Sequence, residues 1–338
     1  GTHKTLKLLR SLYGLRSSPK SWNTRFSEFM KTLNFRRSEH DNCLYVGENV
    51  YLVLFVDDAI ITGETHQVDK VIEALKEEFQ VKTFDKVDSF LGMSVKRNEN
   101  CIKVSQPILI EKLQKEFGMV HCRSVNTPME VGFFREDVDV NNGIPFRRLV
   151  CTLMYIAVTS RPDISFATCF LARYLDKPSD QLFDAAKRIV RYLAHTKDLG
   201  LTFTPGDNGL VSYSDADWGG DKESRKSVSG FIAFHNGNPI SWFSKKQTSV
   251  ALSTMEAEYI SSATSAQELV NLKGIVSEFG FSEMPVLKID NLSAISLIKT
   301  SDNSKRAKHI ELKYHFIKDL CERKIIDVQY VSTNENIA

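Results

Sequence analysis

Residues 213–218 read Tyr-Ser-Asp-Ala-Asp-Trp, and this stretch decides how the second half of the chain is expected to fold. Positions 210–214, which overlap the start of this stretch, have the composition of a strand. Asp215 is therefore expected where a strand ends. A lone acid in such a place is more often a turn or capping residue than a metal ligand, so its meaning depends on the other acids of the chain.

Two further segments place acids in a similar setting. Glu256 and Glu258 open a long helix predicted over 256–279, and Asp290 ends a strand predicted over 286–289. Strand-end acids and one acid from a neighbouring helix can converge on one pair of cations, because no single segment can surround a metal. Glu256 and Glu258 also suit a helix N-terminus electrostatically. The order and context of these acids favour the metal site.

Another pair of carboxylates, Asp57 and Asp58, lies inside the apolar run 51–61. Burying adjacent carboxylates costs free energy unless they are paired or bind a cation. Two interpretations stay open. The pair lies in an exposed hairpin turn, where Asp is favoured, although tight hairpin turns prefer Gly. Alternatively, it binds Mg²⁺ together with substrate phosphates.

The composition of the chain is that of an ordinary globular protein, with 338 residues, 42% of them hydrophobic and 25% charged. This length predicts two or three domains. A formal net charge of +2 neither requires nor excludes a nucleic-acid partner. The six cysteines include no C-x-x-C pair, which argues against a disulfide framework or zinc site and for an intracellular protein. No apolar run is long enough to span a bilayer.

Apolar periodicity predicts the remaining elements. Helices are expected over 67–80, 107–118, several units within 145–198, and 311–322, and strands over 201–203, 229–234, 240–243 and 327–331. The segment 126–145 is rich in turn and acidic residues, which is typical of a linker. A basic run over 305–315 is either a solvated helix face or a surface that contacts phosphates.

Taken in order along the chain, several motifs resemble those of the copia group of long-terminal-repeat retrotransposon Pol polyproteins, in the C-terminal part of the reverse transcriptase and in RNase H. In the first half these are Leu12-Tyr13-Gly14-Leu15 with Pro19 and Trp22, Phe55-Val56-Asp57-Asp58, Phe90-Leu91-Gly92-Met93, and Leu153-Met154-Tyr155 with Thr159-Ser160-Arg161-Pro162-Asp163. In the second half they are Ser214-Asp215-Ala216-Asp217-Trp218, Glu256-Ala257-Glu258-Tyr259, Asp290-Asn291 and Lys305-Arg306-Ala307-Lys308-His309.

The resemblance implies a multidomain fold of the α+β and α/β classes. Residues 1–105 would form a partial reverse transcriptase palm, and residues 106–205 a helical thumb and connection. Residues 206–338 would form an RNase H-like domain, truncated at its C-terminus, in which helices pack on a mixed five-stranded sheet.

The resemblance also implies which residues carry the chemistry. Asp57 and Asp58 would be catalytic metal ligands of the polymerase. Asp215, Glu258 and Asp290 would be catalytic metal ligands of the RNase H, with Glu256 as the alternative to Glu258. The cofactor would be Mg²⁺ or Mn²⁺ at both sites.

The implied function is that of an RNA-directed DNA polymerase with RNase H, which uses two-metal phosphoryl transfer on nucleic acid. Partners would be a primer-template, an RNA·DNA hybrid and, in the intact enzyme, deoxynucleoside triphosphates. Nucleic-acid contacts are expected from Gly92, Arg306, Lys308 and His309. No membrane partner is expected, and the location would be intracellular, in the cytoplasm, a virus-like particle or the nucleus.

Three departures from the family pattern leave enzymatic activity open. The family's first palm aspartate would lie upstream of Leu6, and its last RNase H aspartate would follow Ala338. Ser17 stands where the family has Gln near the incoming nucleotide. The alternative function is therefore a catalytically inactive remnant that only binds nucleic acid.

Overall fold

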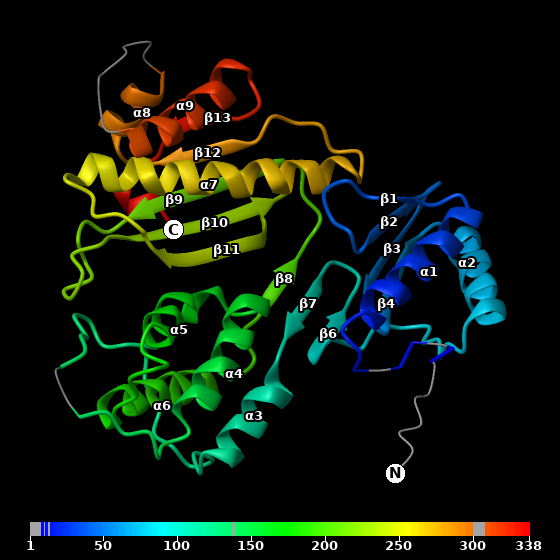
Figure 1. Ribbon diagram of the computed structural model, residues 1–338, viewed down its shortest axis with the longest axis horizontal. Helices are drawn as coiled ribbons and strands as arrows, with labels where there is room; N and C mark the ends of the chain where they lie inside the picture. Colours follow the sequence, from blue (N-terminus) through cyan, green and yellow to red (C-terminus); the bar gives the residue numbers. More distant parts are fainter. Residues whose placement is uncertain (1–7, 10, 13, 137–138, 300–307) are drawn as a thin grey trace, which may run out of the picture. The chain divides into compact units, whose positions relative to one another are not determined.

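The computed structural model describes residues 8–9, 11–12, 14–136, 139–299 and 308–338 (Figure 1). The chain divides into two units. Unit 1 comprises Gly1–Lys86 and Gly274–Gly280, and unit 2 comprises Val87–Lys273 and Phe281–Ala338. The functional borders expected at residues 105 and 205 stay predictions.

Unit 1 is an antiparallel sheet packed with two helices. The sheet has the order β1-β2-β3-β4, and an aromatic cluster around Phe26 and Phe79 fills the space between sheet and helices. Pro19 lies in the first turn of α1, where its missing N–H costs no hydrogen bond. The elements are α1 (Ser18–Thr32), β1 (Arg36–Arg37), β2 (Leu44–Gly47), β3 (Val50–Phe55), β4 (Asp58–Gly63) and α2 (Thr65–Glu78).

Unit 2 begins with a small antiparallel sheet of order β5-β6-β7-β8. Its strands are β5 (Ser89–Phe90), β6 (Met93–Arg97), β7 (Ile102–Ser105) and β8 (Leu201–Phe203). Strand β8 pairs with β7 although a helical region separates the two strands in sequence. That pairing brings the end of the predicted connection next to the end of the predicted palm segment.

The described residues between β7 and β8 form the α-helices α3 (Pro107–Glu116), α4 (Phe146–Thr159), α5 (Ser165–Ala172) and α6 (Asp180–His195), with a short 3-10 helix over Pro162–Ile164. They share one core, to which α4 contributes the fully buried Leu149, Leu153 and Ile156 at helical spacing. Ser179 caps α6 by accepting a hydrogen bond from the Leu182 amide at 3.3 Å. In the described part of the linker predicted over 126–145, no helix or strand forms.

The C-terminal part of unit 2 is a mixed five-stranded sheet of order β11-β10-β9-β12-β13, as the sequence predicted. Strands β9, β10 and β11 are antiparallel, whereas β12 runs parallel to both β9 and β13. Figure 1 shows α7 alongside this sheet. The elements are β9 (Leu210–Ala216), β10 (Val228–His235), β11 (Asn238–Lys246), α7 (Thr254–Ser277), β12 (Val286–Ile289), α8 (Leu292–Lys299), α9 (Lys308–Glu322) and β13 (Asp327–Tyr330).

None of the helices in the described part of the chain has both the length and the apolar character that a membrane crossing requires.

A buried arginine holds the helical region together. The side chain of Arg161 is almost fully buried and donates to both carboxylate oxygens of Asp163, at 2.8 and 2.6 Å. It also donates to the carbonyl and the hydroxyl of Thr196, at the end of α6, at 2.9 and 2.7 Å. The Thr159–Asp163 motif therefore joins the end of α4 to the end of α6.

Replacing Arg161 with alanine is expected to lower the free energy of unfolding by about 3 kcal/mol, because the change removes the cation that pairs with Asp163 and the donor to the Thr196 carbonyl. Urea denaturation followed by circular dichroism measures the loss. The matched control is Arg147→Ala, which removes an ion pair to Asp176 in which both side chains are largely exposed. That control is expected to change stability by no more than about 0.5 kcal/mol, and an equal loss in both variants would contradict a structural role for Arg161.

Candidate functional site

Three carboxylates meet at one edge of the five-stranded sheet. Asp215 lies near the end of β9, Asp290 directly after β12, and Glu258 in the second turn of α7. Each offers one oxygen, and these oxygens lie within 4.8 Å of one another. Because β9 and β12 are parallel neighbours, their carboxyl ends lie at the same edge. We call Asp215, Glu258 and Asp290 the carboxylate cluster.

Glu258 is the most buried member of the cluster, with only 6% of its surface exposed. Its Oε1 accepts a hydrogen bond from the amide of Ala216 at 3.2 Å, whereas its Oε2 is buried and has no hydrogen-bond partner among the described residues. Burial and the negative charges of Asp215 and Asp290 raise the pKa of Glu258 to about 8. A cation would supply the missing partner and relieve the repulsion.

The pKa of Asp215 is also raised, first by burial and then by the charge of Asp290. The pKa values of Asp215 and Glu258 are therefore raised by the same two causes, burial of the carboxyl group and the negative charge of neighbouring carboxylates. This arrangement of oxygen ligands suits a hard divalent cation such as Mg²⁺.

Buried hydroxyl groups hold α7 against β9 beneath the cluster. Ser261 donates to the carbonyl of Asp215 at 2.8 Å, and its hydroxyl lies 2.9 Å from that of Ser214. Ser265, one turn further along α7, donates to the Ser214 hydroxyl at 3.0 Å. These serines were missed by sequence reasoning. Their signal was the spacing of three and four residues that places Glu258, Ser261 and Ser265 on one helix face.

Glu256 has a different role from Glu258. Its carboxylate accepts a hydrogen bond from the amide of Leu252 at 2.9 Å, while its own amide donates to the hydroxyl of Ser253 at 3.2 Å. This pattern is a variant of the capping box at the start of α7, in which the side chain of Glu256 reaches the amide of Leu252, one residue before Ser253. Of the two alternatives left open by the sequence, the structure brings Glu258 and not Glu256 to Asp215 and Asp290.

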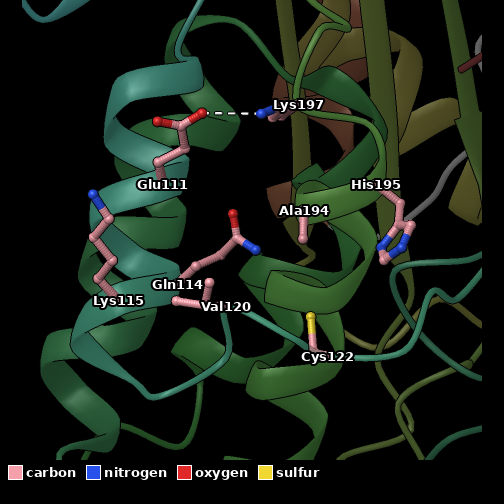
Figure 2. A pocket seen from close by; sticks show the side chains of 8 residues that line it. All are labelled: Glu111, Gln114, Lys115, Val120, Cys122, Ala194, His195 and Lys197. Atoms are coloured by element: carbon pink, nitrogen blue, oxygen red, sulfur yellow. Dashed lines mark hydrogen bonds and ion pairs between the residues drawn. The ribbon is translucent and has the colours of Figure 1, made fainter.

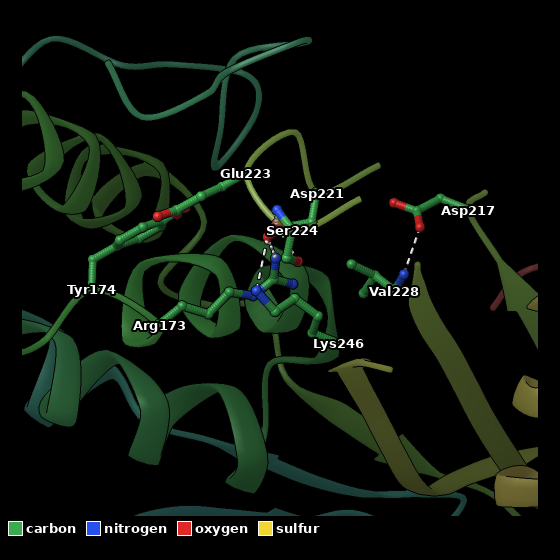
Figure 3. Close-up of polar contacts among 8 residues, drawn as sticks. All are labelled: Arg173, Tyr174, Asp217, Asp221, Glu223, Ser224, Val228 and Lys246. Carbon is green, nitrogen blue, oxygen red and sulfur yellow. Dashed lines mark hydrogen bonds and ion pairs between the residues drawn. The ribbon is translucent and has the colours of Figure 1, made fainter. Parts of the chain in front are cut away.

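The loop between β9 and β10 is anchored by a second set of acids, which do not belong to the cluster (Figure 3). Asp217 accepts a hydrogen bond from the amide of Val228 at 2.5 Å. Asp221 has a buried side chain that accepts from Arg173 of the α5 C-terminus at 3.1 Å and from Lys246 of β11 at 3.2 Å. Burial opposes ionisation of Asp221, but hydrogen bonds from Ser224 and Lys246 outweigh it and lower its pKa to about 2.

The pair Asp57 and Asp58 lies in unit 1, at the hairpin between β3 and β4. Phe55 pairs with Asp58, so Val56 and Asp57 form a two-residue turn, and both aspartates are exposed. Val56 has a φ of 54°, a conformation that valine rarely adopts. The indole of Trp22 donates to the carbonyl of Val56 at 3.0 Å and holds this turn. The backbone at this point therefore forms an exposed hairpin turn, as one of the two interpretations predicted. Metal binding by Asp57 and Asp58 stays a prediction.

The remaining predicted contact residues are spread over unit 2. Gly92 lies in a tight turn between β5 and β6 with a φ of 73°, and the hydroxyl of Tyr155 donates to the carbonyl of the preceding Leu91. Lys308 and His309 begin α9, but their side chains lie outside the described residues, as does Arg306 entirely. The expected nucleic-acid contacts of all four residues stay predictions.

A pocket of about 390 Å³ lies between α3 and α6, and none of the predicted site residues lines it (Figure 2). Two of its lining residues, Glu111 and Lys197, form an ion pair of 3.0 Å. The carboxylate cluster, rather than this pocket, therefore remains the candidate site.

Comparison with known proteins places these features in a family context. The model of the reverse transcriptase (RNA-dependent DNA polymerase) family matches residues 1–131. The chain is 35% identical to the Retrovirus-related Pol polyprotein from transposon TNT 1-94 of Nicotiana tabacum, over 99% of this chain and 27% of that protein. It is 34% identical to the corresponding polyprotein from transposon RE2 of Arabidopsis thaliana, over 98% of this chain and 24% of that protein. The chain thus spans about a quarter of the length of these relatives.

Among solved structures, the foamy viral protease-reverse transcriptase in complex with RNA/DNA hybrid has a TM-score of 0.57 to this chain. It covers 96% of this chain and 39% of the viral chain at 14% identity. At that identity the likeness supports the fold alone.

The raised pKa of Glu258 predicts how stability depends on pH. Because its folded pKa of about 8 lies above the ordinary value of 4.5, this group contributes stability that is fully present below 4.5 and lost as the pH rises through about 8. In metal-free buffer, the free energy of unfolding of Glu258→Gln is expected to decrease less with rising pH than that of the wild type. At alkaline pH the variant is expected to be more stable than the wild type by at least about 1 kcal/mol.

Urea denaturation at a series of pH values between 5 and 9, in the presence of a chelator, measures this difference. The matched control is Glu256→Gln, whose side chain faces the backbone of Leu252 instead of Asp215 and Asp290. Parallel pH profiles for Glu258→Gln and wild type would show that Glu258 does not hold an extra proton in the native state.

Proposed function

Because this chain belongs to the copia-type retrotransposon Pol polyproteins, with a reverse transcriptase part and an RNase H-like fold, we propose that its carboxylate cluster cleaves the RNA strand of RNA·DNA hybrids. The observation that carries the proposal is the convergence of Asp215, Glu258 and Asp290 from three separate segments on one sheet edge. Burying acids that repel one another costs free energy, and a bound cation offsets that cost.

We infer that the cluster holds Mg²⁺ or Mn²⁺. The chemistry of the residues fits such an ion, since all offered ligands are oxygens and Oε2 of Glu258 has no partner among the described residues. When bound, a pair of such ions activates a water molecule and stabilises charge on the leaving oxygen of a phosphodiester.

The protein's own contribution is to fix the ligands before the metal arrives. Ser261 ties the backbone of Asp215 to α7, and Ala216 orients the carboxylate of Glu258. Glu258 must release its proton when a cation enters, because only the ionised carboxylate binds a metal well.

For unit 1, we propose the polymerase role of the family: Asp57 and Asp58 would bind the metal ions that join a deoxynucleoside triphosphate to a primer. The match of residues 1–131 to the reverse transcriptase family supports this assignment. Gly92, Arg306, Lys308 and His309 would contact the primer-template or the hybrid.

A second candidate for unit 1 is nucleic-acid binding without catalysis. The observation that favours it is the exposed position of Asp57 and Asp58, which no third metal-ligating residue joins within the described ranges. A template-dependent primer extension assay separates the two candidates.

Cleavage of a hybrid tests the nuclease proposal. With a labelled RNA·DNA hybrid and Mg²⁺, Asp215→Asn and Asp290→Asn are each expected to lower the cleavage rate by about 100-fold or more, because each removes a ligand from the metal site. Gel analysis of the labelled RNA measures the rate. The control Glu256→Gln keeps the hydrogen bond to Leu252 and is expected to retain most of the activity. Hybrid binding without cleavage by the wild type would favour the inactive, binding-only alternative.

Metal binding is expected to displace the proton of Glu258. At neutral pH, titration calorimetry in buffers of different ionisation enthalpy should detect up to one proton released for each binding event in the wild type. Glu258→Gln should release correspondingly less and bind Mn²⁺ more weakly. Equal proton release in both proteins would assign the displaced proton to another group.

A further inference from the structure

Large apolar side chains are exposed beside the carboxylate cluster. Trp218, just beyond β9, is 57% exposed, and Leu252, just before α7, is 82% exposed. Single exposed apolar residues are common on protein surfaces. These two are distinguished by their position, since they lie on the segments that carry Asp215 and Glu258.

Both residues are held firmly. The indole nitrogen of Trp218 donates to the carbonyl of Ala251 at 3.1 Å, which places the ring next to Leu252. Ala251 is itself buried in a small apolar core with Ala257 and Ile260. The amide of Leu252 is bound by Glu256 of the capping box.

The same backbone joins this surface to the cluster. Ala216 packs against the small core that contains Ala251, and its amide donates to Glu258. A molecule bound at the cluster would therefore lie next to Trp218 and Leu252.

The charge of the cluster indicates why such a surface is needed. The negative charge of the cluster repels the phosphates of a nucleic acid, so bound metal ions and uncharged groups beside the cluster would favour binding at this place. The wide, shallow minor groove of an A-form-like helix is open to protein side chains, and a large uncharged ring can bury apolar area against the sugars and base edges there.

We propose that Trp218 and Leu252 form an apolar platform that packs on the sugars and base edges of the hybrid's minor groove and positions the strand to be cut. This inference rests on the proposed nuclease function. Neither side chain has a charge, so the platform should contribute affinity that does not depend on salt, unlike contacts of lysine or arginine with phosphates.

The test measures binding of a fluorescent RNA·DNA hybrid to the full 338-residue chain. All proteins also contain Asp215→Asn, which prevents cleavage during the measurement. Trp218→Ala is expected to raise Kd by about tenfold and Leu252→Ala by about threefold, with no change in the slope of log Kd against log salt concentration. Trp218→Phe, which keeps an aromatic face, is expected to restore most of the affinity.

Met284→Ala is the matched control. Met284 is 46% exposed and lies before β12, at the opposite end of that strand from Asp290. The Met284→Ala substitution is expected to leave Kd unchanged. Circular dichroism verifies that each variant is folded. The hybrid should also quench the fluorescence of Trp218, measured as the difference between the wild-type residue and Trp218→Phe while Trp22 and Trp242 are retained.

Several outcomes would overturn the platform. Equal Kd values for a folded Trp218→Ala and its parent would do so, as would a loss of affinity accompanied by a lower salt slope. Concentration-dependent self-association that Trp218→Ala abolishes, with hybrid binding unchanged, would instead assign the surface to a second copy of the chain. If the wild type neither binds nor cleaves the hybrid, the proposed function fails first and the platform fails with it.

Discussion

The packing of α7 on β9 is the contact on which the candidate site depends. Glu258 and Asp215 repel each other, and the pKa of each is raised by burial and by neighbouring charge. Their positions are maintained by the hydroxyls of Ser214, Ser261 and Ser265, which link helix to strand without charge. Because these hydroxyls are paired with one another, the site keeps its geometry while Glu258 retains an unpaired oxygen.

The rest of unit 2 supports this contact from outside the sheet. Asp221 joins α5 and β11 through Arg173 and Lys246, and so fixes the loop that follows the strand of Asp215. Trp242 of β11 donates to the carbonyl of Ala157 at the end of α4, at 2.8 Å. The helical region therefore contacts the edge strand β11 of the sheet, and a substitution that destabilises one of them is expected to destabilise the other.

Strand patterns predicted that Asp215 and Asp290 each lie at the end of a strand, where they could share one sheet edge. The five-stranded sheet itself was implied by the resemblance to the retrotransposon family, because the pairing of β9 with β12 joins segments far apart in the sequence and no local pattern fixes it. The family resemblance favoured Glu258 over Glu256, and the geometry of the cluster agrees with that choice. Local sequence rules alone do not separate the two acids, since both lie early in α7 and the choice depends on which helix face meets β9. They also could not place the turn at Val56, whose φ of 54° no local preference assigns to valine.

Metal binding at the carboxylate cluster, as proposed, would link the stability of the fold to the presence of a cation. Without metal, ionisation of Glu258 above a pH of about 8 opposes folding. An ion that binds the native cluster and not the unfolded chain adds RT ln(1 + [M]/Kd) to the free energy of unfolding, and so offsets this loss. A divalent cation bound at this sheet edge would thus stabilise an arrangement that is electrostatically unfavourable in the metal-free chain. The same negative charge repels a nucleic acid, so the uncharged surface of Trp218 and Leu252 and the bound cation would act together to admit it.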